Sequence, residues 1–373
     1  MHVAFVNENV LGHGSYLLPF VRALEADPGH GVTPHLVDAV PLPPDLASWG
    51  DASVKGLRRW GLDFHPARWR RAASLHARRR LDALRARQRI DAVVVNTQSV
   101  GLELVDIAAE LPVLVCLDAT FAQLARSDWL APNRVSRRLL PLTLAPIRGR
   151  ERALLAAAHR LLVWSEPVGC SLREDYAVEG ARIERLPPSI SLPPVVERRR
   201  EPGRRPQLLF LGGDFHRKGG PLLLECWRRH FADRCDLHLV TQSEVAPEPG
   251  VHVHRGVAAH TPEWRARWEQ ADVFVFPSAL ETFGIVLLEA LAFGVPVVSS
   301  DAGAARDVLA DGRAGIVLER RDPESLAAAI ASVLDHPVTA RARADVGRAR
   351  VETEFELGAN TARLAALLRA ARG

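Results

Sequence analysis

The stretch from Pro277 to Asp307, PSALETFGIVLLEALAFGVPVVSSDAGAARD, decides the fold. The apolar run Ala271–Phe276 is typical of a buried strand, and Gly284 leads into the helical pattern IVLLEALAF, which stops at Gly294. Val295–Ser299 predicts the next strand. In such a strand–loop–helix–strand unit, the helix begins with unpaired backbone N–H groups and a positive dipole end, which favour a phosphate.

Two carboxylates frame this predicted phosphate site. Glu281 lies in the loop before the helix, and Glu289 lies on the helix itself. Because a carboxylate repels a phosphate, we expect both to accept hydrogen bonds from sugar hydroxyls instead. The alternative is a surface helix with two solvated glutamates. That alternative is weaker, because Glu289 interrupts an apolar helix, where an unpaired carboxylate is costly.

The same residues carry a resemblance to a known family. PSALETFGIVLLEALAFGVPVVSS resembles the signature of family 4 of the retaining glycosyltransferases, in which two glutamates are separated by seven residues. SDAGAARDVL resembles the glycine-rich loop that follows, although Ala304 stands where a second glycine is usual and Asp307 where a glutamate is usual. The resemblance implies an α/β protein with the GT-B fold, in which two Rossmann-like, doubly wound domains face each other across a cleft.

The resemblance also implies the domain borders. An acceptor-binding domain would span residues 1–195, a donor-binding domain residues 196–352, and a C-terminal helix in 353–373 would pack back on the first domain. The proline-rich segment 183–194 (IERLPPSISLPP) cannot sustain a helix, which agrees with a crossing between domains near residues 185–205.

A second phosphate-binding pattern opens the predicted donor domain. The strand Gln207–Leu211 is followed by GGDFHRKGG at 212–220, which contains the parts of a pyrophosphate site. Lys218 is one of only two lysines in a chain rich in arginine, which favours a requirement for a compact charge. By the resemblance, Arg217 and Lys218 bind the diphosphate, and Gly213 stands where many members have another arginine. A surface turn with two ordinary cations is the weaker alternative.

The resemblance implies a full set of site residues. Those expected to bind the donor come from glycine-bearing loops and from the head of the predicted helix: Gly12, Gly14, Gly213, Arg217, Lys218, Gly256, Val257, Glu281, Thr282, Phe283, Gly284, Ile285, Val286 and Glu289. Those expected to take part in catalysis are Glu281, Lys218, Arg217 and Asp118. Cations and helix N–H groups would neutralise the leaving diphosphate without a metal, Glu281 would orient the sugar, and Glu289 would bind the ribose.

Polar residues in the first domain are candidates for the acceptor. Asp118 follows the strand Val113–Cys116, in the region where open parallel sheets bind ligands. Family members often carry a histidine near this point, and Asp118 either takes its place or caps a helix, with capping favoured. His13, Asn96 and Thr120 are the other acceptor candidates, and each is also compatible with an ordinary loop position.

Basic residues crowd the stretch from Lys55 to Arg89, where only Asp63 and Asp82 oppose them. Two interpretations of this stretch are open. It either contacts an anionic surface, such as lipid headgroups or an anionic acceptor, or forms a solvated arginine-rich helix face. Nucleic acid is disfavoured, because no recognition motif accompanies the charge.

The composition is that of an ordinary protein with two cores: 373 residues, 47% hydrophobic, 25% charged and a net charge of +4. No apolar run has transmembrane length, and MHVAFVNENV lacks the features of a signal peptide, so we expect a cytoplasmic protein, with or without peripheral contact at the inner face of the membrane. Cys116, Cys170, Cys226 and Cys235 lack metal-ligand spacing and are expected to be reduced. We expect no cofactor beyond the nucleotide sugar as co-substrate.

The function that we expect is transfer of a sugar from a nucleotide-diphosphate donor to an acceptor hydroxyl of a small molecule, glycan or lipid-linked acceptor, with retention of configuration. Two alternatives come from other classes. A nucleotide-sugar epimerase or phosphorylase of the same fold would interconvert or release the sugar, and a non-catalytic homologue would bind a nucleotide sugar or a membrane without turnover. Intact Glu281, Lys218 and Glu289 argue against the non-catalytic alternative.

Overall fold

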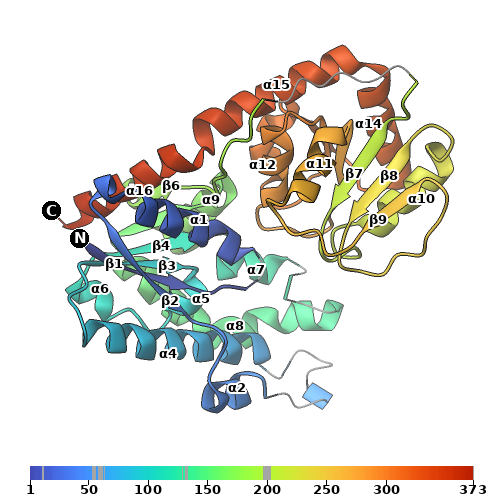
Figure 1. The fold of residues 1–373 in the computed structure, drawn as a ribbon. Coiled ribbons are helices and arrows are strands. Elements are labelled where there is room, and N and C mark those ends of the chain that lie inside the picture. Colours follow the sequence, from blue (N-terminus) through green and yellow to red (C-terminus); the bar gives the residue numbers. More distant parts are fainter. Residues whose placement is uncertain are drawn as a thin grey trace. The chain divides into compact units, whose positions relative to one another are not determined.

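A computed structural model describes residues 1–10, 12–52, 56–57, 62, 64–127, 129–130, 133–195 and 203–372. The chain divides into two compact units, the first made of Met1–Ser189 with Leu357–Gly373 and the second of Ile190–Glu356 (Figure 1). The borders expected from the sequence lie a few residues away, at 195 and 352. Each unit contains a six-stranded sheet whose paired strands are all parallel, as predicted for an α/β fold.

The sheet of the first unit has the strand order β2-β1-β3-β4-β5-β6. Every residue of β3 and β4 is buried, because helices cover both faces of the sheet. The strands are β1 (His2–Asn7), β2 (Thr33–Asp38), β3 (Ala92–Asn96), β4 (Val113–Leu117), β5 (Arg160–Val163) and β6 (Ile183–Arg185).

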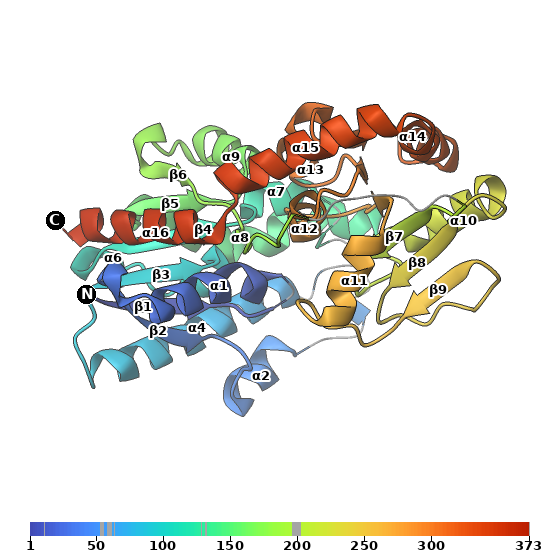
Figure 2. The same ribbon diagram turned by 45° about the horizontal axis from the view of Figure 1, so that its top comes forward.

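The helices of the first unit form a layer on each face of this sheet. Figures 1 and 2 both show α1 and α16 side by side on one face, with α4 and α8 on the other. The elements are α1 (His13–Ala26), η1 (Pro28–His30), α2 (Pro44–Gly50), α4 (His65–Arg85), α5 (Gln98–Gly101), α6 (Ile107–Glu110), α7 (Phe121–Arg126), α8 (Arg134–Ala157), α9 (Glu166–Tyr176), η2 (Gly180–Arg182) and α16 (Leu357–Arg372).

Helix α8 is much longer than the run in the sequence that has a helical pattern. That run, RERALLAAA at residues 150–158, predicts a short helix, whereas α8 begins at Arg134 and contains Pro141 and Pro146. A proline inside a helix removes one backbone hydrogen bond and leaves a carbonyl without its partner. Both prolines are exposed, so water can reach that part of the helix. The buried side of α8 continues through the prolines with Leu140, Leu144 and Ile147.

The sheet of the second unit has the strand order β12-β11-β10-β7-β8-β9. Strands β7 and β10 are neighbours, and the chain order reverses between them, which is the feature that marks ligand crevices in open α/β sheets. The strands are β7 (Gln207–Leu211), β8 (Asp236–Val240), β9 (Val251–His254), β10 (Val273–Phe276), β11 (Val297–Ser300) and β12 (Ile316–Leu318).

Helices also cover both faces of the second sheet. Helices α10 and α14 pack against each other on one face, and α11 and α12 lie on the other (Figure 1). The elements are α10 (Gly220–His230), α11 (Pro262–Gln270), α12 (Ile285–Ala292), α13 (Ala305–Val308), η3 (Ala310–Gly312), α14 (Pro323–Asp335) and α15 (Pro337–Glu354). The strand–loop–helix–strand unit predicted around Glu281 is therefore β10, α12 and β11.

The cysteines have the state predicted from the sequence. All four are free thiols, and Cys116, Cys226 and Cys235 are buried while Cys170 is half-buried. Burial raises the pKa of the Cys116 and Cys226 thiols to about 12, so they stay protonated and unreactive.

Candidate functional site

Two loops of the second unit lie together at the carboxyl ends of β7 and β10. One loop, 212–219, connects β7 to α10, and the other, 277–284, connects β10 to α12. The carbonyl of Arg217 accepts a hydrogen bond from the backbone N–H of Ala279 at 3.4 Å, so the loops are joined directly. The strand order reverses at this point, which makes these loops the candidate site.

The basic pair and the first glutamate of the sequence motif meet between these loops. The Lys218 ammonium donates to Oε1 of Glu281, and the Arg217 guanidinium lies 3.6 Å from the same oxygen. The Ser278 hydroxyl donates to this oxygen at 3.0 Å. The Glu281 side chain is only 7% exposed, so the carboxylate depends on these partners for its charge compensation.

The helix that follows begins as the sequence predicted. Gly284 is the N-cap of α12 and has φ of 89°, a left-handed conformation that a side chain would strain. No side chain caps this terminus. The N–H groups of Ile285 and Val286 belong to the first turn, which has no partners within its own helix, so the end of α12 can accept an anion.

The glycine-rich loop after β11 packs closely against the backbone of the loop that carries Glu281. A Cβ atom on Gly303 would lie 2.7 Å from the carbonyl oxygens of Glu281 and Thr282, a distance that real contacts do not show. Ala304 is 1% exposed, and its methyl group fits where the resembled family has glycine. Phe283 is also buried and packs on Phe355, with ring centroids 6.5 Å apart, so its side chain anchors the loop.

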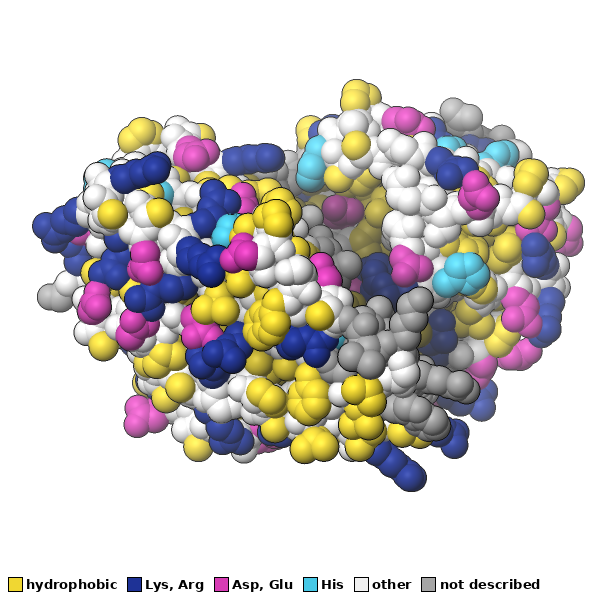
Figure 3. Space-filling model, turned by 90° about the horizontal axis from the view of Figure 1, so that it is seen from below, with side chains coloured by type: hydrophobic (Ala, Val, Ile, Leu, Met, Phe, Trp, Pro, Cys, Tyr) yellow, Lys and Arg dark blue, Asp and Glu magenta, His cyan; other side chains and the backbone are white. Residues whose placement is uncertain are grey.

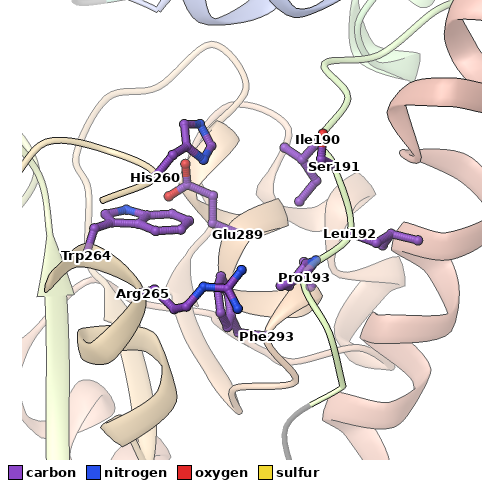
Figure 4. Close-up of a pocket in the computed structure, with 10 residues that line it drawn as sticks. Ile190, Ser191, Leu192, Pro193, His260, Trp264, Arg265, Glu289 and Phe293 are labelled. Carbon is purple, nitrogen blue, oxygen red and sulfur yellow. The ribbon is translucent and has the colours of Figure 1, made fainter. Parts of the chain in front are cut away.

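Glu289 lies on α12 and lines a pocket of about 150 Å³ (Figure 4). The wall is formed by His260, which precedes α11, by Trp264 on α11 and by the segment 190–193 opposite, with Arg265 of α11 at the lower side of the view. In the described part of the chain, the Glu289 carboxyl has neither a hydrogen bond nor an ion pair. Surrounding protein atoms desolvate it, which raises its pKa to about 8.

The other donor-side candidates in this unit are backbone positions. Gly256 follows β9, is exposed and has φ of 77°, and Val257 beside it is half-buried. Gly213 is exposed, and its carbonyl accepts hydrogen bonds from the Thr241 hydroxyl and the Gln242 N–H, both at 3.2 Å. None of the three contacts Lys218 or Glu281 through a hydrogen bond in the described residues.

In the first unit, a histidine is held between two carboxylates at the carboxyl edge of the sheet. Nδ1 of His13 lies 3.0 Å from Glu8, and Nε2 lies 3.2 Å from Asp118. Burial alone would lower the pKa of His13, but Asp118 and Glu8 outweigh it and raise that pKa to about 10. His13 was expected in a loop, whereas it is the first residue of α1 and is protonated at neutral pH.

The preferred role for Asp118 was wrong. The cap of α7 is Thr120, whose hydroxyl accepts from the Gln123 N–H at 3.1 Å while the Gln123 side chain bonds back to the Thr120 N–H. Threonine with glutamine three residues later is a capping box, a signal that the sequence contained. Thr120 is fully buried, and its hydroxyl lies 2.7 Å from that of Ser171, so its groups are used within the fold.

The remaining candidates of the first unit also make structural contacts. Asn96 is fully buried and donates to Asn7 at 3.2 Å and to the His13 carbonyl at 3.0 Å. Gly12 is exposed beside the start of α1. A Cβ atom on Gly14 would lie 2.6 Å from Oδ1 of Asn9, so a side chain there would displace that amide.

Several arginines of the basic stretch pair with carboxylates, most of which lie far away in the sequence. Lys55, Arg58, Arg59 and Asp63 lie outside the described residues. Within the described part, four arginines of α4 pair with acids: Arg71 with Glu103, Arg78 with Asp106 and with Asp82 of the same helix, Arg79 with Asp45, and Arg85 with Glu110. Figure 3 views the face on which α4 lies and shows basic side chains mixed with acidic and apolar ones. This pairing favours the solvated helix face.

Two negative findings concern the described residues alone. No group of three or more His, Cys, Asp or Glu side chains there has the arrangement of a metal site. No helix there is both long and apolar enough to span a bilayer. A reaction without a metal stays a prediction.

Two charged residues of these sites were missed by the sequence analysis. Glu8 is 3% exposed and directly follows β1, so the rule that ligand-facing groups follow parallel strands could have found it. Arg321 lies in the loop between β12 and α14 and donates from Nε to the Pro277 carbonyl at 2.8 Å. Arg321 lies 44 residues after Pro277 in the sequence, and no local motif indicates that the two residues are in contact.

Comparison with known proteins agrees with this geometry. Residues 205–336, which contain Arg217, Lys218, Glu281 and Glu289, match the family model described as glycosyl transferases group 1. The part of the chain that holds the candidate site is therefore similar to the group 1 glycosyltransferases. This similarity agrees with the family that the sequence motif indicated.

Group 1 glycosyltransferases are also found among proteins of similar sequence. A D-inositol 3-phosphate glycosyltransferase of Geodermatophilus obscurus is 32% identical over 212 residues, 49% of this chain and 47% of that protein. A GDP-mannose-dependent alpha-(1-6)-phosphatidylinositol monomannoside mannosyltransferase of Mycolicibacterium smegmatis is 32% identical over 217 residues, 50% of this chain and 56% of that protein. A glycogen synthase of Mycobacterium tuberculosis is 42% identical over 97 residues, 26% of this chain and 23% of that protein. The chain thus spans about a quarter to just over half of these relatives.

Solved structures share the fold over nearly the whole chain. A sucrose-phosphate synthase of Thermosynechococcus elongatus has a TM-score of 0.74 at 19% identity, covering 99% of this chain and 98% of that one. HepE of Anabaena, solved in complex with UDP and glucose, has a TM-score of 0.64 at 15% identity, covering 99% and 100%. These likenesses identify the fold as GT-B, as predicted.

Proposed function

We propose that this protein transfers a sugar from a nucleoside diphosphate donor to an acceptor hydroxyl, with retention of configuration and without a metal. The observation that carries the proposal is the meeting of Lys218, Arg217 and Glu281 at the switch point of the second sheet, next to the uncapped start of α12. Two relatives in the comparisons agree with such a donor, since one is named as GDP-mannose-dependent and one was solved with UDP and glucose.

The cations would stabilise the leaving group. As the glycosidic bond to the donor breaks, the diphosphate gains negative charge. Lys218, Arg217 and the first N–H groups of α12 supply positive charge and hydrogen-bond donors where that charge develops. Preorganised donors of this kind need no reorganisation during the step, which is why they lower the barrier.

Glu281 would change partners when the donor binds. In this structure, its carboxylate is compensated by Lys218 and Arg217. A diphosphate draws both cations toward its own oxygens, because phosphate is the stronger anion. The Glu281 carboxylate is then available to accept hydrogen bonds from the sugar hydroxyls and to orient the sugar.

Glu289 would bind the nucleoside. It lacks a hydrogen-bond donor in the described residues and lines a pocket with aromatic and apolar walls. The two hydroxyls of a ribose would provide the missing donors, and the base would extend along Trp264.

The proton of the acceptor needs a base, and the leaving phosphate oxygen can take it. In that step, the bond from the acceptor oxygen to the anomeric carbon forms on the face from which the diphosphate departs. The acceptor proton moves to the phosphate, so no protein nucleophile is required. Asp118 and His13 are the candidates of the first unit for binding the acceptor. The proposal includes no membrane contact by the basic stretch, because four arginines of its described part are already paired with carboxylates.

The experiment that tests this proposal is a screen of UDP-, GDP- and ADP-sugars by thermal shift and by slow release of the sugar. We expect stabilisation by one nucleotide class. Lys218→Ala should weaken binding of that nucleoside diphosphate by about 2 kcal/mol, the scale of a lost charged hydrogen bond. Glu281→Gln should abolish sugar release while nucleotide binding persists. Arg228→Ala, which removes an exposed cation paired with Glu248, is the matched control and should change neither.

Several outcomes would contradict the proposal. No thermal shift with any nucleoside diphosphate would remove the donor site, and normal turnover of Glu281→Gln would remove the role of that carboxylate. Interconversion of the donor sugar without an acceptor would indicate an epimerase instead.

A further inference from the structure

Arg321 links the two loops of the candidate site from a third element. It lies between β12 and α14, and its Nε donates to the carbonyl of Pro277, the residue that directly follows β10. Four residues after Pro277 comes Glu281. The guanidinium therefore sits at the base of the loop that carries the first glutamate of the motif.

The same guanidinium lies against the start of α10. Gly219 is the N-cap of that helix and has φ of 81°. A Cβ atom on Gly219 would lie 2.0 Å from the Pro277 carbonyl oxygen and 3.2 Å from an Nη atom of Arg321. Only glycine allows this close approach. Lys218 directly precedes Gly219. Arg321 therefore lies against both loops, and its contact in the first loop is one residue away from Lys218.

Arg321 differs from the neighbouring cations because no carboxylate pairs with it in the described residues. Arg217 and Lys218 both lie against the Glu281 carboxylate. In the part of the chain that the structure describes, no carboxylate pairs with Arg321, and its Nη groups donate to nothing. Partial desolvation lowers its pKa, with no acid to offset the effect. The adjacent Arg320 is 77% exposed and pairs with Asp322 at 3.3 Å.

We propose that Arg321 is a third cation for the diphosphate of the donor, in which Nε holds the Pro277 carbonyl while the Nη groups bind phosphate oxygens. The guanidinium has five N–H donors in a planar fork that matches phosphate oxygens, and only one of them donates to a residue that the structure describes. An anion arriving between the loops meets Arg217 and Lys218 already compensated by Glu281, whereas Arg321 is uncompensated. Arg321 is thus the cation that attracts the diphosphate before Glu281 releases the other two. This inference rests on the proposed function.

Calorimetric titration tests the assignment. The probes are UDP, GDP and ADP, each compared with uridine, guanosine and adenosine, which lack the phosphates. For the nucleoside diphosphate that the wild type binds, Arg321→Gln should bind about tenfold more weakly or worse, from the loss of charged hydrogen bonds. Binding of the matching nucleoside should stay within twofold of the wild type. Arg320→Gln is the matched control and should bind both probes normally.

A structural role for Arg321 would give a different pattern. If Arg321→Gln bound diphosphate and nucleoside with equal losses, or bound the diphosphate normally, the inference would be overturned. Arg321→Lys keeps the charge and loses the fork, so we expect an intermediate affinity for the diphosphate, and this variant serves if the glutamine variant unfolds. A wild type that binds no nucleoside diphosphate would overturn the proposed function and the inference together. Normal binding by Arg321→Gln would overturn the inference alone.

Discussion

Each unit carries a cluster of ionisable groups at the carboxyl edge of its sheet. The two clusters differ in how many of these groups have a partner. In the first unit, His13 lies between Glu8 and Asp118, and the Thr97 hydroxyl donates to Glu8 at 2.7 Å. The side chains of His13, Glu8 and Asp118 are 15%, 4% and 11% exposed. Each charge there has a partner of opposite sign within the same unit.

The cluster of the second unit leaves two ionisable groups without partners in the described residues. Glu281 is paired with Lys218, but the Glu289 carboxyl has no hydrogen-bond donor and the exposed Arg321 guanidinium has no carboxylate there. Removing one partner of a buried charge pair costs stability, because the remaining charge is left unpaired. The first cluster should therefore depend on its internal pairs, whereas Glu289 and Arg321 have groups that no described residue uses.

The largest expected effect tests the completeness of the first cluster. His13→Ala leaves Glu8 and Asp118 without their shared cation, which should cost about 3 kcal/mol of the free energy of unfolding near pH 7. The folded pKa of His13 is about 10, above its ordinary 6.5, so its stabilisation is fully present below pH 6.5 and lost as the pH rises through 10. Urea unfolding of both proteins from pH 6 to pH 10.5 measures this.

The control for that experiment removes the carboxylate charges as well. Adding Glu8→Gln and Asp118→Asn to His13→Ala should restore part of the stability. If His13→Ala alone were as stable as the wild type at pH 7, the pairs of His13 with Glu8 and Asp118 would not stabilise the fold. The contrast between the two clusters would then be lost.

An intermediate effect of opposite sign is expected at Glu289. Its folded pKa is about 8, above the ordinary 4.5, so the folded protein keeps a proton that the unfolded chain loses between these values. Stability should therefore fall as the pH rises from 4.5 to 8, and Glu289→Gln should remove this fall, with a gain on the order of 1–2 kcal/mol at pH 9 after allowance for partial exposure. Thermal unfolding from pH 5 to pH 9 measures it.

The matched control is Glu225→Gln, which alters an exposed glutamate paired with Arg229 in the same unit. It should leave the pH dependence unchanged. If Glu289→Gln were destabilising at every pH, the Glu289 carboxyl of the wild type would have a partner in solution. The contrast between the units would then weaken.

The smallest effect is expected on the basic face of α4. Replacing Arg79 and Arg80 together by glutamate should leave binding to phosphatidylserine-containing vesicles unchanged, because carboxylates already compensate the charge of this face. Vesicle co-sedimentation at low ionic strength, with phosphatidylcholine vesicles as the control, measures it. A several-fold loss of binding in the variant would restore the membrane-contact reading and would make the first unit a ligand-binding surface too.

The local parts of the fold and site could be predicted from the sequence. Gly284 marks the start of α12 both in the sequence pattern and in the structure, because caps, glycines and apolar periodicity act over a few residues. The placement of Lys218 and Glu281, 63 residues apart, in one site was reached only through the family motif, and their direct pairing was not predicted.

Contacts between distant segments were the part that could not be predicted. The pairing of His13 with Asp118 spans 105 residues, and neither residue carries a local signal of the other. The carboxylates that neutralise α4 come from separate elements, so counting charges along 55–89 overstated its positive charge. The first half of α8 contains Pro141 and Pro146, and the sequence alone does not show that both prolines face solvent.

The position of α16 has a consequence for the order in which the chain folds. Its residues follow the whole second unit in the sequence, yet they complete the first unit beside α1. During synthesis, residues 190–356 emerge as one continuous piece and can form their sheet at once. The first unit, begun earlier, keeps one face of its sheet partly uncovered until the last helix leaves the ribosome. The older half of the nascent chain is therefore the one that matures last and depends longer on protection from aggregation.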